Sequence, residues 1–135
     1  MKMFLGEYNP NITDGSRIAL PKKFREQLSE DELVLSKGFD KCIFIYAKED
    51  WSEKVQKQVE NSAGTIKRTD LERYLFTSAS EVSVDSQGRL VIPSNLKDYA
   101  QIDTRTAVIG VGDHIEIWDH EMWQKQLGKI AAQLG

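Results

Sequence analysis

The stretch that decides the fold is VDSQGRLVIP, residues 84–93, because a similar stretch, ITDGSRIALP, occupies residues 12–21. The two starting positions differ by 72 residues, and the same offset pairs Trp51 with Trp123. Further pairs at this offset are Gly38 and Gly110, Ile43 and Ile115, Ile45 and Ile117, and Glu49 and Glu121. Self-similarity at a fixed offset is typical of a duplicated structural unit. The chain is therefore predicted to contain two tandem copies of one fold.

Each copy is predicted to begin with a β-hairpin followed by a short helix. In the second copy, apolar and polar residues alternate on both sides of the turn residues Asp85 to Gly88, as in two half-buried strands. Asp85 can accept backbone N–H bonds, and Gly88 can adopt a positive φ at little steric cost. Pro93 then ends the strand and suits the first turn of a helix, predicted over 93–99.

The first turn departs from the second in the position of its acidic residue. Thr13 stands at the place of Asp85, and Asp14 follows one position later, before Gly15. Because Asp-Gly is typical of two-residue hairpin loops, the sequence predicts a tighter turn centred on this dipeptide. Pro21 then opens the helix of the first copy.

Two strands and a longer helix are predicted after the short helix of each copy. The strands cover 33–35 and 43–46 in the first copy, and 107–109 and 115–118 in the second. Glu116 corresponds to Phe44, which indicates that one strand is exposed on a face that the other buries. Apolar residues then recur at helical spacing in Trp51, Val55 and Val59, and in Trp123, Leu127, Ile130 and Leu134. Both stripes are expected to contact the core rather than form a binding groove.

The predicted architecture is mainly β with short helices, in the α+β class. Its parts are a first half over 7–50, a helical connector over 51–78, a second half over 79–122 and a C-terminal helix over 123–135. Within the connector, Thr69 is expected to N-cap a helix over 70–76. Two independent domains within 135 residues would each be marginally stable, so the halves are expected to share a core.

The composition indicates a soluble globular protein, with 40% hydrophobic and 29% charged residues. No apolar run approaches the roughly 18 residues of a membrane span, and no secretory segment is recognisable, so a cytoplasmic location is expected. The net charge of −3 speaks against a generic polyanion binder. However, residues 1–25 carry +3 and the remainder −6, which allows a basic face on an acidic body.

The sequence predicts no metal site, no cofactor and no catalytic residues. Cys42 is the single cysteine and is expected to be a small buried hydrophobe. The spacing of His114 and His120, with Asp113 nearby, fits none of the familiar zinc patterns. Nucleophile and phosphate-cradle motifs are also missing. A hydrolase that uses Asp85 remains an alternative.

The duplicated DxxxR pattern, followed by an apolar strand and proline, resembles the MraZ family of bacterial transcriptional regulators, whose halves are similar to the AbrB, SpoVT and MazE DNA-binding fold. The resemblance covers nearly the whole chain. It also includes Met3-Phe4-Leu5-Gly6 before the first strand and Arg73-Tyr74-Leu75-Phe76 before Ala79 and Glu81. It implies two tandem AbrB-like swapped-hairpin halves that form a pseudo-two-fold, double-split β-barrel.

The resemblance also implies a function. Such proteins form homo-oligomeric rings, bind direct repeats in promoter DNA upstream of their own operon, and regulate the division and cell-wall gene cluster. A cytoplasmic, nucleoid-associated location follows. With few positive charges in each chain, several copies would be needed for tight binding. The alternative is an antitoxin-like or scaffold role in which the helices of Trp51 and Trp123 clasp a protein partner.

The candidate DNA-binding residues lie in and after the two turns. The resemblance transfers the DxxxR arginine to Arg17 and Arg89, and a planar guanidinium held on a rigid turn can read guanine O6 and N7 or bind phosphate. Asp85 and Arg89 could instead only pair with each other. The candidate phosphate contacts are Lys22, Lys23 and Arg25. The residues expected to support the turns are Asp85, Gly88, Thr13, Asp14 and Gly15.

Overall fold

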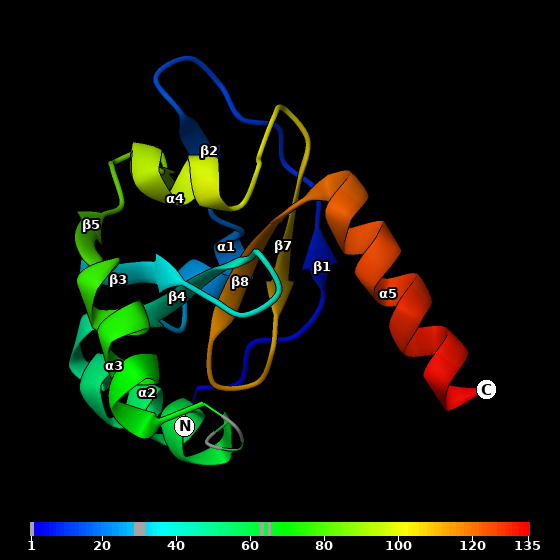
Figure 1. The fold of residues 1–135 in the computed structure, drawn as a ribbon. Coiled ribbons are helices and arrows are strands. Elements are labelled where there is room, and N and C mark those ends of the chain that lie inside the picture. The colour runs from blue at the N-terminus through cyan, green and yellow to red at the C-terminus, as the bar shows by residue number, and fades with distance from the viewer. Residues whose placement is uncertain (1, 29–31, 63, 65) are drawn as a thin grey trace.

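The computed structural model describes residues 2–28, 32–62, 64 and 66–135. The first half contains β1 (Glu7–Tyr8), β2 (Arg17–Ala19), α1 (Lys22–Arg25), β3 (Glu32–Lys37), β4 (Ile43–Ala47), a 3₁₀ turn η1 (Lys48–Asp50) and α2 (Trp51–Ser62). Then follow α3 (Arg68–Thr77), β5 (Ser80–Ser83), β6 (Arg89–Val91), α4 (Ser94–Tyr99), β7 (Thr106–Gly110), β8 (Ile115–Asp119) and α5 (His120–Leu134). The predicted mainly β fold with short helices is confirmed (Figure 1).

The strands of the described residues form two antiparallel sheets. The larger has six strands in the order β1-β7-β8-β4-β3-β5, and the smaller contains β2 and β6. At the centre of the larger sheet Phe44 pairs with Glu116, and in the smaller sheet Ile18 pairs with Leu90. Both pairs join residues that are equivalent in the internal repeat. Equivalent residues face each other only when a two-fold relation connects the halves, so a pseudo-two-fold axis passes through both sheets.

The hairpin strands pair across the halves and not within their own hairpin. Strand β1 pairs with β7, β5 with β3, and β2 with β6. The hairpins predicted from the sequence are therefore limited to one residue pair at each turn, Thr13 with Arg17 and Asp85 with Arg89. Beyond these pairs the two strands of each hairpin diverge and pair with other strands. Alternation of apolar and polar residues indicates which face of a strand is buried, but it does not identify the partner strand. The swapped arrangement joins the halves into one unit.

Two hydrophobic cores lie on opposite faces of the six-stranded sheet. The first lies between the two sheets and the short helices, and the second lies between the larger sheet and helices α2 and α3. Strand β4 contributes to both, because Ile43 and Ile45 enter the first core and Phe44 and Tyr46 enter the second. All five of its residues are buried, as expected for a central strand covered on both faces.

The two predicted helical stripes have different outcomes. In α2, Val55 and Val59 are fully buried beneath α3, so the prediction of core contact is confirmed. In α5 it is confirmed only for Trp123, which packs against the second core; it is wrong for the rest of the stripe, because Leu127 is 39% exposed and Ile130 is 36% exposed. Helix α5 contains no buried residue and extends away from the sheet (Figure 1). Helix α3 covers α2, whereas no helix of the described residues covers α5 in the same way.

Two further sequence predictions are corrected. Glu116 is not on an exposed face: its side chain is only 14% exposed, and its carboxylate accepts from Nε1 of Trp118 at 2.9 Å and lies 2.8 Å from Nε2 of His114. Thr69 does not cap the connector helix, which begins two residues earlier than predicted, at Arg68, with Lys67 in the N-cap position. As for the membrane, no helix in the described part of the chain has both the length and the hydrophobicity of a span.

Candidate nucleic-acid interface

The two DxxxR arginines lie on the same two-stranded ribbon. Ile18 and Leu90 pair at its centre, and both point into the first core with 1% exposure. Because successive side chains of a strand point to opposite faces, the flanking residues face outward. These residues are Arg17, Ala19, Arg89 and Val91, and Val91 is 45% exposed. The outward face of the ribbon therefore presents two arginines related by the pseudo-two-fold axis.

The second turn is held by the carboxylate of Asp85. Its Oδ1 accepts hydrogen bonds from the backbone N–H groups of Gln87 at 2.8 Å and Arg89 at 3.0 Å. The N–H of Asp85 donates to the carbonyl of Arg89 at 2.7 Å, and Gly88 adopts a φ of +77°. These backbone hydrogen bonds, chiefly that from Arg89, hold the pKa of Asp85 below its usual range. The sequence predicts that Asp85 and Gly88 support this turn.

The side chain of Arg89 lies against the same carboxylate. Its Nε is 3.4 Å from Oδ2 of Asp85, and the Arg89 side chain is 33% exposed. The contact is not a well-directed hydrogen bond, since this buried Nε has no hydrogen-bond partner of good geometry. One oxygen of Asp85 thus orders the backbone of the turn, and the other orients the guanidinium by charge.

The first turn has the same length as the second, so the prediction of a tighter turn is wrong. Thr13 and Arg17 exchange two backbone hydrogen bonds at 2.9 and 3.3 Å. Three residues lie between them, with φ of +79° at Gly15 and +57° at Ser16. The pairing of Arg17 with Val91 across the halves determines where the turn ends, and this constraint outweighs the local Asp-Gly preference.

Arg17 is oriented differently from Arg89. Its Nη1 donates to the backbone carbonyl of Asp14 at 3.3 Å. The same nitrogen lies over Gly15, where a Cβ atom would overlap it. The first turn therefore holds its arginine by a carbonyl, and Gly15 leaves the space that the guanidinium occupies.

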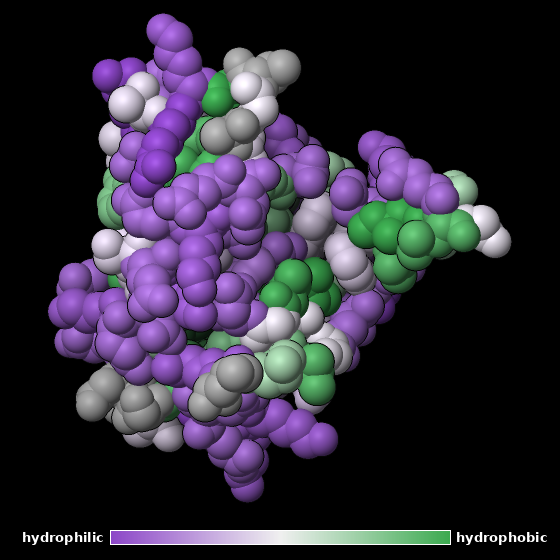
Figure 2. All heavy atoms as spheres, turned by 90° about the horizontal axis from the view of Figure 1, so that it is seen from below, coloured by the Kyte–Doolittle hydropathy of each residue, from purple (hydrophilic) through white to green (hydrophobic). Residues whose placement is uncertain are grey.

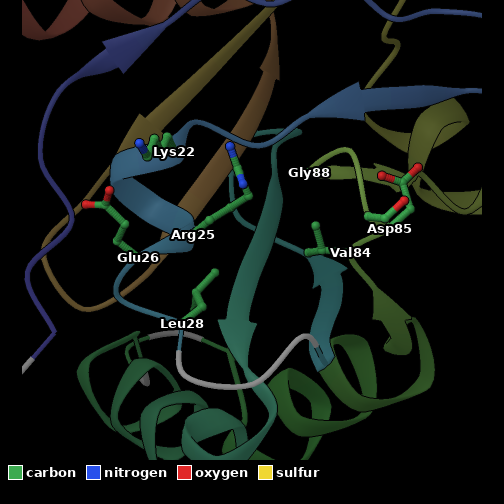
Figure 3. A pocket seen from close by; sticks show the side chains of 8 residues that line it. Lys22, Arg25, Glu26, Leu28, Val84, Asp85 and Gly88 are labelled. Carbon is green, nitrogen blue, oxygen red and sulfur yellow. The ribbon is translucent and has the colours of Figure 1, made fainter.

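The three cations of α1 do not share one environment. All three are exposed, but Arg25 also donates from Nε to the carbonyl of Leu20 at 3.0 Å. Its guanidinium also lies against the Cα of Gly88, within 2.7–3.1 Å of where a Cβ would be. Arg25 thus lies where α1 meets the second turn, beside a cavity of about 380 Å³ lined by both elements (Figure 3).

A matching contact on the other side of the pseudo-two-fold axis was missed from the sequence. Lys97 on α4 donates from Nζ to Oγ of Ser16 in the first turn at 3.2 Å. Lys97 and Ser16 are the repeat equivalents of Arg25 and Gly88. The 72-residue offset identifies Lys97 as the equivalent of Arg25, but it does not predict this contact. The contact forms because the swapped strands bring the helix of one half to the turn of the other.

The histidines considered for a metal site lie in different surroundings. His114 is buried, and its ring nitrogens lie 2.9 Å from Oδ1 of Asp113 and 2.8 Å from Oε2 of Glu116. Burial lowers the pKa of His114, but the hydrogen bonds to these carboxylates outweigh burial and leave the pKa raised. His120 instead lies 3.3 Å from the guanidinium of Arg105. Within the described ranges no cluster of His, Cys, Asp and Glu is arranged to hold a metal ion.

Comparison with known proteins places the whole chain in one group. A family described as "MraZ protein, putative antitoxin-like" matches residues 3–74 and again residues 75–134. A protein of Clostridium tetani named "Transcriptional regulator MraZ" is 41% identical, over 91% of this chain and 86% of its own length. Proteins with the same name from Desulforamulus reducens and Moorella thermoacetica are 38% and 37% identical, over 91% and 97% of this chain and 86% and 91% of their own lengths. The two family matches coincide with the tandem copies in the sequence.

Proposed function

The chain belongs to the MraZ family and is a transcription regulator, not an enzyme, and from this premise we propose that it acts by binding specific DNA sequences upstream of its own operon. The single observation that carries this proposal is the outward face of the β2–β6 ribbon, where Arg17 and Arg89 are related by pseudo-two-fold symmetry. A two-stranded antiparallel ribbon can enter the major groove of DNA. Two guanidinium groups on such a ribbon can each contact guanine O6 and N7.

The remaining candidate residues have supporting roles in this proposal. Lys22 and Lys23 are exposed on α1 next to the ribbon, and they contact phosphates without reading sequence. Arg25 adds a third positive charge on the same helix. Order in the turns comes from Asp85 and Gly88 in the second and from Thr13, Asp14 and Gly15 in the first. Less entropy is then lost when the arginines bind.

Self-association completes the proposed mechanism. Few cations of one chain can face the DNA, and the acidic remainder opposes binding, so one copy binds weakly. A head-to-tail ring of identical subunits would present its ribbons at regular intervals, which suits direct repeats and increases affinity through effective concentration. The exposed apolar side chains of α5, visible on the protruding helix in Figure 2, support such an assembly. A regulator of this kind would act in the cytoplasm on the nucleoid.

The target proposed from the family resemblance is the division and cell-wall gene cluster.

The antitoxin-like or scaffold alternative gains no support from the two tryptophans. Trp51 packs against Tyr46 and Phe76, whereas Trp123 packs against Trp118 and donates its Nε1–H to Glu7. Both side chains are thus engaged within the chain, and neither forms an open clasp.

The proposal is tested by a gel shift with DNA from upstream of the chain's own gene. The wild-type protein is expected to retard a fragment with the natural repeats far more strongly than a fragment with one repeat. The double variant Arg17→Ala, Arg89→Ala should lose specific retention but keep the oligomeric mass of the wild type. Unchanged retention by this variant would refute the assignment of the two arginines, and tight binding to one isolated repeat would refute the role of assembly.

A further inference from the structure

Arg25 makes two contacts that a phosphate-binding side chain does not need. Its Nε donates to the carbonyl of Leu20 at 3.0 Å, at the end of β2. Its guanidinium lies against the Cα of Gly88, in the turn that carries Arg89. Figure 3 shows Arg25 extending from α1, with Asp85 and Gly88 on the neighbouring turn. A guanidinium can make both contacts at once because it is a rigid planar group with several donors, whereas a lysine ammonium is a compact point charge on a flexible stem.

The backbone around this contact is also shared between the halves. The N–H of Leu20 donates to the carbonyl of Gly88 at 2.9 Å, and the N–H of Ile92 donates to the carbonyl of Ser16 at 2.9 Å. The two hydrogen bonds are equivalent under the repeat. Each turn is thus joined to the other half by a backbone hydrogen bond and by a cationic side chain, which is Arg25 for the second turn and Lys97 for the first.

We propose that Arg25 is a positioning residue that holds the turn over residues 85–89, and through it Arg89, in the geometry that meets DNA. Lys97 has the corresponding role for the first turn through Ser16. The side chain of one half thereby determines how the other half presents its arginine. This inference rests on the proposed DNA-binding function for its consequence in binding, but the bracing of the turn can be measured without DNA.

The first test uses the free protein and the variant Arg25→Lys, which keeps the positive charge and loses the planar group. Solvent exchange of the Gln87 and Arg89 amides is measured by NMR, because both N–H groups donate to Asp85 in the ordered turn. Exchange at these amides should accelerate in Arg25→Lys and stay unchanged in Lys23→Ala, a control on the same helix. Unchanged exchange in Arg25→Lys would overturn the proposal, whether or not the protein binds DNA.

The equivalent contact supplies a test of specificity. Lys97→Ala should accelerate amide exchange at Arg17 in the first turn and leave Gln87 and Arg89 unchanged, whereas Arg25→Lys should do the reverse. Acceleration of both turns by either variant would indicate general loosening of the fold and would contradict separate braces.

The second test measures DNA binding at several salt concentrations. As a positioning residue, Arg25 should not be rescued by lysine: Arg25→Lys should bind about five- to tenfold more weakly, the scale of one ordinary intramolecular hydrogen bond. Its salt dependence should match the wild type, because the charge is retained. Wild-type affinity in Arg25→Lys, together with a shallower salt dependence in Arg25→Ala, would show that Arg25 only neutralises phosphate. Failure of the wild-type protein to bind would instead refute the proposed function, with the exchange measurement still deciding the brace.

The variant Gly88→Ala tests the contact between Arg25 and the second turn by changing the turn residue. An added Cβ would meet the Arg25 guanidinium at 2.7 Å in a backbone with φ of +77°. Backbone strain at residue 88 is the same with or without Arg25, so Gly88→Ala is also made in an Arg25→Ala background. Gly88→Ala should accelerate exchange at Gln87 and Arg89 more in the presence of Arg25 than in its absence. Equal acceleration in the two backgrounds would contradict the contact.

Discussion

At the scale of single residues, the same sequence motif is stabilised in two different ways. Asp85 orders the second turn with a carboxylate that accepts two backbone N–H bonds. Thr13 at the equivalent position carries no charge and donates its hydroxyl to the carbonyl of Arg17 at 3.4 Å. The first turn otherwise relies on the backbone pairing of Thr13 with Arg17, and the carbonyl of Asp14 holds the Arg17 side chain. Both turns keep three residues in the loop because the strand that follows is paired with the other half.

His114 is the buried residue whose charge is expected to couple stability to pH. It faces Asp113 and Glu116 and stacks on Tyr46. Burial raises the pKa of the nearby Cys42 thiol, and Glu116, which lies against His114, raises it further. Since its pKa is raised in the folded state, the protonated ring stabilises the fold fully below the unfolded pKa of about 6.5. That contribution is lost as pH rises through the raised value.

The expected result is that the free energy of unfolding in urea falls as pH rises above the unfolded pKa of about 6.5. The variant His114→Gln should be less stable at the lower pH and should lose this part of the pH dependence. His120→Gln, at the half-buried histidine beside Arg105, serves as the control and should retain it. A pH dependence that survives in His114→Gln would show that other groups cause it.

At the scale of elements, the β2–β6 ribbon separates structural from functional residues by strand alternation. Ile18 and Leu90 fill the first core, and their neighbours Arg17, Arg89 and Val91 face outward. A ribbon this short is stable only because its inner face is covered by the larger sheet and the short helices. The apolar residues therefore hold the arginines in place without contacting DNA.

Truncation of the ribbon's inner face should destabilise the whole fold. Ile18→Ala is expected to lower the free energy of unfolding by about 2–4 kcal/mol, because a buried isoleucine leaves a cavity in a core shared by both halves. Val91→Ala, on the outward face, should change it by less than about 0.5 kcal/mol. Chemical denaturation followed by circular dichroism compares the two. Equal effects would mean that the inner face of the ribbon is not closely packed.

At the scale of the whole molecule, the duplicated halves differ most in their final helices. The apolar stripe of α2 is covered by Leu71 and Leu75 of α3. The equivalent stripe of α5 beyond Trp123 stays exposed, at Leu127, Ile130 and Leu134. Contiguous exposed apolar side chains of this kind are typical of protein–protein contacts. This favours contact between copies of the chain.

Substitution on α5 should therefore change assembly rather than folding. Ile130→Glu is expected to leave the unfolding free energy within about 0.5 kcal/mol, because the side chain is exposed in the single chain. Its sedimentation coefficient should fall as the oligomer dissociates. Ala132→Glu adds the same charge on the opposite side of the helix by helical spacing, and it should sediment like the wild type. Equal behaviour of the two variants would exclude the apolar stripe as the contact.

The sequence by itself determined the duplication, the positions of the two turns, the mainly β class and the residues that face the cores of most elements, because repeats and residue periodicity are local properties of the chain. Tertiary structure alone decided that the strands exchange between halves, that Arg25 and Lys97 reach the opposite turns, and that the stripe of α5 is left uncovered. Periodicity shows that a face is apolar, whereas its cover and its partner strand depend on contacts between residues far apart in the chain. The physical reason is that a strand of given pattern gains the same hydrogen bonds and burial from either half, and the shared core favours the exchanged pairing.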